Sequence, residues 1–194
     1  MGIKIGLTGN IASGKSQVSK MFEEAGFTVF DADVLAHELY EHDTALVQAI
    51  GKAFGPGVVV DGTIDRKTLG AIVFSDAGAL RTLDKLVGPA LDKYTRAKLE
   101  ACTNDKIVLD GALLIEWGIQ VWFDQLIMVV CDDSIRHERL MNRNNLSEEE
   151  AQQRIDSQMP QYNKIPYADI VIENNGSFID LGQEFSDVLK ELDI

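Results

Sequence analysis

The chain has 194 residues, of which 45 % are hydrophobic and 25 % charged, and these proportions indicate one globular domain with a full-sized core. Its formal net charge of −13 argues against general nucleic-acid binding, which relies on a basic surface. No apolar run reaches the roughly 18 residues that a membrane span needs, the first residues lack the pattern of a secretory signal, and two cysteines are too few for a disulfide framework. We therefore expect a cytoplasmic protein without membrane association, in which any anionic ligand is held by local positive groups and backbone amides.

Apolar segments alternate with helical patterns along the chain, which is typical of an α/β protein with an open parallel sheet. The segments with the composition of buried strands cover residues 3–8, 27–30, 106–109, 125–130 and 169–172. The segments with helical spacing cover residues 15–25, 32–40, 45–54, 65–74, 77–102, 133–143 and 147–158, with a last helix after Ser177. Thr44 and Asp65 are expected caps, Ser147 begins a capping box, and Gly88-Pro89 is expected to interrupt the long helix. The sequence thus predicts a five-stranded parallel sheet flanked by helices.

A glycine-rich pattern, Gly-x-x-x-x-Gly-Lys-Ser, lies between the first predicted strand and the first predicted helix. Its residues are Gly9, Asn10, Ile11, Ala12, Ser13, Gly14, Lys15 and Ser16. The glycines let the backbone curl so that its N–H groups face phosphate oxygens, and the next helix directs its positive end at the same anion. Lys15 can reach the β- and γ-phosphates of ATP, and the Ser16 hydroxyl can bind Mg²⁺. The pattern in this context predicts a P-loop phosphotransferase that uses ATP and Mg²⁺.

Carboxylates follow two of the predicted strands, at the edge where ligands bind in open α/β sheets. Asp33 is interpreted as a group that orients or deprotonates the attacking hydroxyl, and Asp31 as better suited to capping the helix that follows. Asp110 ends the strand at 106–109, and two interpretations stay open for it: a carboxylate near Mg²⁺, or a turn former before Gly111.

Arginines recur in the second half of the chain. Arg136, Arg139 and Arg143 are spaced to share one helix face, and Arg154 belongs to the next helix. Such a face is either solvated or a clamp for nucleotide phosphates, and the bend at Asn144-Asn145 favours a mobile lid. Arg139 and Arg143 are our candidates for catalysis.

The ordered set of motifs resembles the dephospho-coenzyme A kinases over nearly the whole chain. The matching segments are Gly6 to Ser16, Asp31 to Asp33, Asp65-Arg66, Leu113 to Glu116, Arg139-Leu140 with Arg143, Ser147 to Ala151, Arg154-Ile155 with Gln158, and Ala168-Asp169 with Asn174 or Asn175. Departures from the family pattern are Gln17, Gly88, Ala112 and Arg136, where relatives often carry Thr, His, Pro and Gln.

The resemblance implies ATP-dependent phosphorylation of the ribose 3′-hydroxyl of dephospho-coenzyme A, the last step of coenzyme A synthesis. It also implies a P-loop, nucleotide-kinase-like fold in which residues 1–194 form a single kinase domain. That domain has a helical acceptor-binding region at about residues 34–99 and a lid at about residues 139–165. Asp33 would then be the base, and Arg139 and Arg143 would belong to the lid. The expected partners are the small molecules ATP and dephospho-coenzyme A, and the oligomeric state is left open.

Two other functions compete with this reading. A P-loop kinase for another nucleoside or nucleotide fits the composition and the spacing equally well. A GTP-dependent switch is disfavoured because no Asp-x-x-Gly occurs, and in Asn163-Lys164-Ile165-Pro166 a proline replaces the carboxylate that would pair with guanine.

Overall fold

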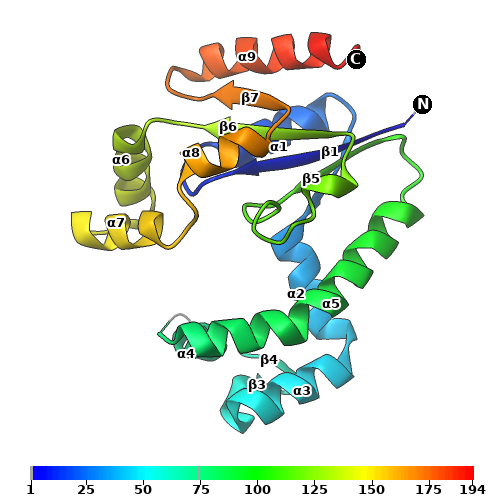
Figure 1. Cartoon of the computed structure of the whole chain (residues 1–194), viewed down its shortest axis with the longest axis vertical. Coiled ribbons are helices and arrows are strands. Elements are labelled where there is room, and N and C mark those ends of the chain that lie inside the picture. The colour runs from blue at the N-terminus through cyan, green and yellow to red at the C-terminus, as the bar shows by residue number, and fades with distance from the viewer. Residues whose placement is uncertain (1, 74) are drawn as a thin grey trace. The chain divides into compact units, whose positions relative to one another are not determined.

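The computed structural model describes residues 2–73 and 75–194 and divides into two compact units (Figure 1). The first, called here the sheet unit, consists of Met1–Asp31 and Thr103–Ile194. The second, the helical unit, consists of Ala32–Cys102. We describe each unit by itself.

The sheet unit contains a five-stranded parallel sheet with the strand order β2-β5-β1-β6-β7. Its strands are β1 (Ile3–Gly9), β2 (Thr28–Asp31), β5 (Lys106–Asp110), β6 (Gln125–Val130) and β7 (Ile170–Glu173). The predicted sheet is confirmed, and each strand end falls within one residue of the expected position. Because all five strands are parallel, their carboxyl ends lie along one edge of the sheet. The strand β1 is the central strand, so the loop that follows it begins at the middle of that edge.

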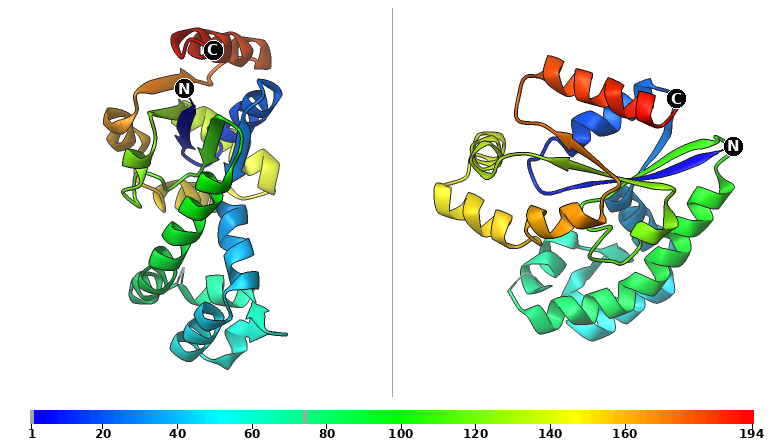
Figure 2. Two further views of the ribbon diagram at one scale, coloured as in Figure 1. Left: turned by 90° about the vertical axis from the view of Figure 1, so that its right-hand side faces the viewer. Right: turned by 45° about the horizontal axis from the view of Figure 1, so that its top comes forward.

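The core of the sheet unit is formed by the sheet with two helices, α1 (Lys15–Glu24) and α9 (Phe178–Glu191), which are drawn in Figure 2. Side chains of the sheet and of both helices form one apolar cluster. Phe22 of α1 makes edge-to-face contacts with Phe27 and Phe185, at centroid distances of 5.0 and 4.8 Å. The remaining helices of this unit are α6 (Asp133–Asn144), α7 (Glu148–Asp156) and α8 (Gln161–Lys164), with 3-10 turns η2 (Gln120–Trp122) and η3 (Ile165–Tyr167). The expected capping box at Ser147 is confirmed, and Ser177, the expected cap of the last helix, forms one as well.

The helical unit packs four helices around an apolar cluster that includes Leu39, Ile50 and Leu69. Its elements are α2 (Ala32–His42), α3 (Thr44–Phe54), η1 (Pro56–Val58), β3 (Val59–Val60), β4 (Thr63–Ile64), α4 (Arg66–Val73) and α5 (Ala77–Ala101). The hairpin of β3 and β4 was not predicted, because two-residue strands are too short to show an alternating pattern. The Asp65 cap is confirmed by bonds from the N–H groups of Lys67 and Thr68, and Phe74, the expected end of α4, lies outside the described residues.

Two expectations for the helical unit are wrong. Asp43, rather than Thr44, caps α3, because its carboxylate accepts the N–H of Leu46 at 2.9 Å. The long helix α5 continues through Gly88 and Pro89 without the expected interruption. Apolar packing on both sides of the proline, by Val87 and Leu91, offsets the missing backbone bond. Although α5 has 25 residues, neither it nor any other helix in residues 2–73 and 75–194 is apolar enough to span a membrane.

Candidate nucleotide site

The predicted phosphate loop connects the carboxyl end of β1 to the start of α1, so the strand–loop–helix context is confirmed. Ala12 and Gly14 both have left-handed backbones, with φ values of 62° and 97°. A Cβ atom at Gly14 would lie 1.9 Å from Nδ2 of Asn174, so both conformation and space require glycine there. When left-handed residues alternate with others in this way, successive backbone N–H groups point into the same concave surface.

Backbone N–H groups of the loop fall into two classes. Ser13 N–H donates to the carbonyl of Asn10 at 3.1 Å, and Ile11 N–H donates to Oε1 of Gln158 at 2.7 Å. Across the described part of the chain, no acceptor faces the N–H groups of Ala12, Gly14, Lys15 and Ser16. These donors lie at the start of α1, whose dipole places partial positive charge at the same point, so together they form an anion-binding surface.

Lys15 forms an ion pair with the carboxylate of Asp110 at the end of β5. The Asp110 side chain is 5 % exposed and that of Lys15 is 19 % exposed, so the pair is largely removed from water. In the sheet register Asp110 stands opposite Leu7 of β1 and Asp31 of β2. The Asp110 side chain therefore points toward the loop lysine. A residue that only formed a turn before Gly111 would not need this contact, so the structure favours a place for Asp110 beside the phosphate loop.

Asp33 lies in the first turn of α2, two residues beyond the end of β2, and is exposed. It belongs to the helical unit, whereas the phosphate loop belongs to the sheet unit. Its part in the reaction stays a prediction.

The three arginines of α6 have different surroundings. Arg136 is 1 % exposed, which rules out a solvated position; its Nε donates to the carbonyl of Ile11 at 3.1 Å. Arg139 is half-buried and donates to Sγ of Cys131 at 3.3 Å, and burial raises the pKa of this thiol. Arg143 is exposed and bonds to the side chain of Asn144 at 2.9 Å. Phosphate contacts by Arg139 and Arg143 stay predictions.

Several residues around the loop were missed as site residues by sequence reasoning. Asn174 follows β7 and donates through Nδ2 to the carbonyl of Ser13 at 2.8 Å, and the carbonyl of Met159 accepts Nδ2 of Asn10 at 2.8 Å. Lys164 is fully buried and bonds to the carbonyl of Ala112 at 2.9 Å and to Glu116 at 2.6 Å. Asn174 was named in the sequence only within the family resemblance, without a role, and no sequence signal predicted that Met159 and Lys164 lie near the loop.

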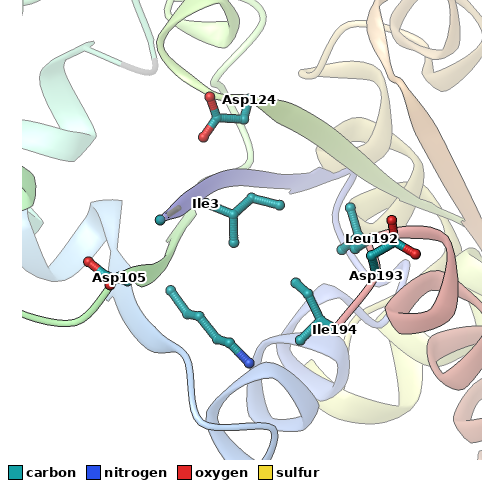
Figure 3. A pocket seen from close by; sticks show the side chains of 8 residues that line it. Ile3, Asp105, Asp124, Leu192, Asp193 and Ile194 are labelled. Carbon is teal, nitrogen blue, oxygen red and sulfur yellow. The ribbon is translucent and has the colours of Figure 1, made fainter.

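A cavity of about 560 Å³ lies elsewhere in the sheet unit, at the amino ends of β1 and β5 (Figure 3). It is lined by Ile3, Asp105, Asp124, Leu192, Asp193 and Ile194, among others. Because the phosphate loop leaves the opposite end of β1, this cavity is separate from the nucleotide site. In residues 2–73 and 75–194 no group of three or more His, Cys, Asp or Glu side chains is arranged to hold a metal ion.

Comparison with known proteins gives a consistent result. The family model described as dephospho-CoA kinase matches residues 3–180. A dephospho-CoA kinase of Geobacillus kaustophilus is 42 % identical, over 100 % of this chain and 98 % of its own length. Among solved structures, TT1252 from Thermus thermophilus has a TM-score of 0.84 and 35 % identity, over 98 % of each chain. A dephospho-CoA kinase from Campylobacter jejuni has a TM-score of 0.72 and 28 % identity, over 97 % of this chain and 96 % of its own.

Proposed function

We propose that this chain, which belongs to the dephospho-CoA kinase family, transfers the γ-phosphate of ATP to the ribose 3′-hydroxyl of dephospho-coenzyme A and so completes coenzyme A synthesis. The observation that carries the proposal is the family match over residues 3–180, supported by the anion-binding loop within it. The proposed place of action is the cytoplasm, where both substrates are small soluble molecules.

The loop is proposed to hold the β- and γ-phosphates of ATP. The N–H groups of Ala12, Gly14, Lys15 and Ser16 supply directional donors, and the Lys15 ammonium supplies charge. Lys15 must then exchange its bond with Asp110 for one with phosphate, or share itself between the two. Because phosphoryl transfer needs little covalent chemistry from the protein, alignment and charge placement are the main tasks of these groups.

Oxygen donors near the loop fit Mg²⁺, which binds through one or two protein oxygens and the substrate phosphates. Ser16, the second residue of α1, offers a hydroxyl, and Asp110 offers a buried carboxylate beside the loop lysine. Bound there, Mg²⁺ would neutralise charge that develops on the transferred phosphoryl group. Ser16 is the proposed direct ligand.

Asp33, an exposed residue in the first turn of α2, is proposed to orient the acceptor hydroxyl and take its proton. Arg139 and Arg143 are proposed to bind phosphate oxygens as the reaction proceeds, in a lid of about residues 139–165. The helical region at about residues 34–99 is proposed to bind the acceptor. These roles rest on the family resemblance together with the position of each residue.

The test is an assay with a panel of acceptors. The protein is incubated with ATP, Mg²⁺ and, in separate reactions, dephospho-coenzyme A, adenosine, AMP and other nucleosides, and ADP release is followed. We expect dephospho-coenzyme A to give the highest kcat/KM, and phosphorus NMR of the product to show a 3′-phosphate. A higher kcat/KM with another nucleoside or nucleotide would instead support the competing kinase function.

A further inference from the structure

The peptide groups of Ile11 are held on both sides by side chains from the second half of the sheet unit. The Ile11 N–H donates to Oε1 of Gln158 at 2.7 Å, and the Ile11 carbonyl accepts Nε of Arg136 at 3.1 Å. Arg136 comes from α6, and Gln158 follows α7. No other loop residue between Gly9 and Ser16 has both its N–H and its carbonyl bonded to side chains of the described chain.

The bond from Arg136 fixes more than the carbonyl it touches. The Ile11–Ala12 peptide is trans, so the carbonyl of Ile11 and the N–H of Ala12 point in opposite directions across one rigid plane. With the carbonyl turned toward Arg136, the Ala12 N–H must point the other way. That N–H belongs to the group with no acceptor in the described protein, which forms the anion-binding surface. The left-handed backbone of Ala12, at φ 62°, makes this orientation costly unless a neighbour holds it.

The Arg136 side chain is buried, although the carboxylate with which it forms an ion pair is exposed to solvent. The Arg136 side chain is 2 % exposed, whereas the side chain of its ion-pair partner, Asp133, is 76 % exposed; Nη1 and Oδ1 are 2.7 Å apart. Its Nη2 is enclosed and has no hydrogen-bond partner in the described part of the chain. A buried cation is costly without full compensation, so the bond to the Ile11 carbonyl is the contact that accounts for its place against the loop.

From these contacts we propose that Arg136 is a positioning residue for the nucleotide, which acts through the Ile11 carbonyl to direct the Ala12 N–H at the phosphates of ATP. The proposal deepens the proposed function by naming a residue that prepares the same site before ATP arrives. Arg136 does not touch the nucleotide in this account. Its contribution is to remove the freedom of one peptide plane, so that ATP binding does not have to order it.

Two substitutions separate the hydrogen bond from the charge. In Arg136→Gln, the amide nitrogen lies the same number of bonds from the backbone as Nε of arginine, so a donor stays at the same place while the charge is lost. In Arg136→Met, both the donor and the charge are lost at similar length. Lys190→Met is the matched control, because it breaks an i,i+3 ion pair of 2.6 Å on the exposed surface of α9 and changes the net charge equally.

The experiment is a calorimetric titration of each folded protein with ATP and Mg²⁺ in the absence of acceptor. We expect Arg136→Met to weaken ATP binding by about ten- to hundredfold, the range that corresponds to one lost buried hydrogen bond with a charged partner. We expect Arg136→Gln and the Lys190→Met control to stay within about threefold of the parent. In steady-state assays with saturating ATP, KM for the acceptor should be unchanged in all three.

Parental ATP affinity in a folded Arg136→Met protein would overturn the proposal. So would an Arg136→Gln protein that binds ATP as weakly as Arg136→Met, because charge rather than peptide orientation would then matter. If the methionine variant does not fold, Arg136→Leu, which also removes both the donor and the charge, takes its place with the same two outcomes, and a tenfold loss in Arg136→Gln overturns the proposal in either case. Because the titration contains no acceptor, its result is independent of whether dephospho-coenzyme A is the substrate.

Discussion

The two units of the protein place their buried polar groups very differently. In the sheet unit the buried polar side chains gather at and around the phosphate loop; they are Thr8, Asn10, Ser13, Asp110, Arg136, Lys164 and Asn174. In the helical unit, among the described residues, Thr95 is the one polar side chain of that class. The polar contacts of the helical unit are part-buried or exposed instead, as in the part-buried bonds of Glu38 with Lys98 and Tyr94.

This difference indicates that the sheet unit fixes the directions of polar groups around the loop, whereas the helical unit is stabilised mainly by its apolar cluster. Buried polar groups are costly unless each finds its partner, and a satisfied network fixes one geometry. The sheet unit accepts that cost around the loop, where donors must point at phosphate before it binds. An apolar cluster such as that of the helical unit tolerates exchange of one hydrophobic residue for another, so it stabilises without fixing polar directions. Four substitutions test this contrast, in decreasing order of expected effect.

Asp33→Asn tests whether the helical unit contributes a catalytic group. If Asp33 is the base, turnover at saturating ATP and acceptor should fall by about 10²–10⁴. ATP affinity and melting temperature should change little, because Asp33 is exposed. Asp43→Asn is the control, since asparagine replaces aspartate well as a helix cap. An Asp33→Asn enzyme with turnover within a few-fold of the parent would remove Asp33 from the mechanism.

Lys15→Met tests whether the Lys15 ammonium contributes both to catalysis and, through its ion pair with Asp110, to the stability of the sheet unit. Turnover should fall by about 10²–10³ through loss of one electrostatic donor to the phosphates. The melting temperature should fall as well, because Asp110 is left buried and unpaired, a change that typically costs about 3–5 kcal/mol.

A second substitution separates the two effects of Lys15→Met. Adding Asp110→Asn removes the unpaired charge, so the double variant should regain much of the lost melting temperature while turnover stays low. If Lys15→Met alone melts like the parent, the ion pair does not contribute to stability as described.

Arg143→Ala tests the proposed lid. Turnover should fall by about 10–10², more than the affinity for the acceptor changes, if the guanidinium stabilises charge that develops late in the reaction. Arg143→Lys should restore only part of the rate, because an ammonium cannot make a bidentate contact with phosphate. Equal kcat values for the alanine variant and the parent would show that Arg143 is a solvated surface residue without a part in the reaction.

Glu38→Gln tests the part-buried contacts of Glu38 in the helical unit. Hydrogen bonds from Lys98 and then Tyr94 lower the pKa of Glu38 below its ordinary value of 4.5, and the same bond to Glu38 raises the pKa of Lys98 above 10.5. The contribution of Glu38 is therefore present above about pH 4.5 and is lost as the pH falls through its lowered pKa. That of Lys98 is present below pH 10.5 and is lost as the pH rises through its raised pKa.

The measurement for Glu38→Gln is hydrogen exchange as a function of pH. At neutral pH the variant should exchange slightly faster in α2 and α5, and its exchange there should depend less on pH than that of the parent. Asp187→Asn, which breaks the surface contact of Lys190 in α9, is the matched control for the sheet unit. Faster exchange in α9 of the Glu38 variant would show that the effect is not local.

The strands and most helix ends could be predicted because their signals are local. Near-continuous apolar runs mark β5 and β6, the capping box at Ser147 lies within four consecutive residues, and Ser177 is a single capping residue before a helical pattern. The continuous α5 could not be predicted, because the local cost of Pro89 is visible in sequence while the packing that offsets it comes from distant residues. Residues 9–16 were predicted as the phosphate loop because their chemistry is contained in one short pattern.

The residues that contact the loop were not predicted, because their contacts depend on segments that are distant in sequence. Arg136 has the spacing of a surface arginine, and no local feature shows that it is buried against Ile11. Asp110 could be read two ways until the sheet register placed it beside the loop strand. Asn174 was named only within the resemblance. Each of these contacts joins segments that only the assembled sheet brings together.

The strand order has a consequence for how the protein is made. Lys15, Ile11 and Ser13 are synthesised before their partners Asp110, Arg136 and Asn174, which follow 95, 125 and 161 residues later. The strand β1 also receives both of its neighbours, β5 and β6, from beyond residue 105. Contacts so far apart in sequence form slowly, and a strand without neighbours invites pairing with other chains. A nascent chain therefore carries the nucleotide motif before it has the residues that surround the loop, and the contacts of the loop can form only after β7 has been synthesised.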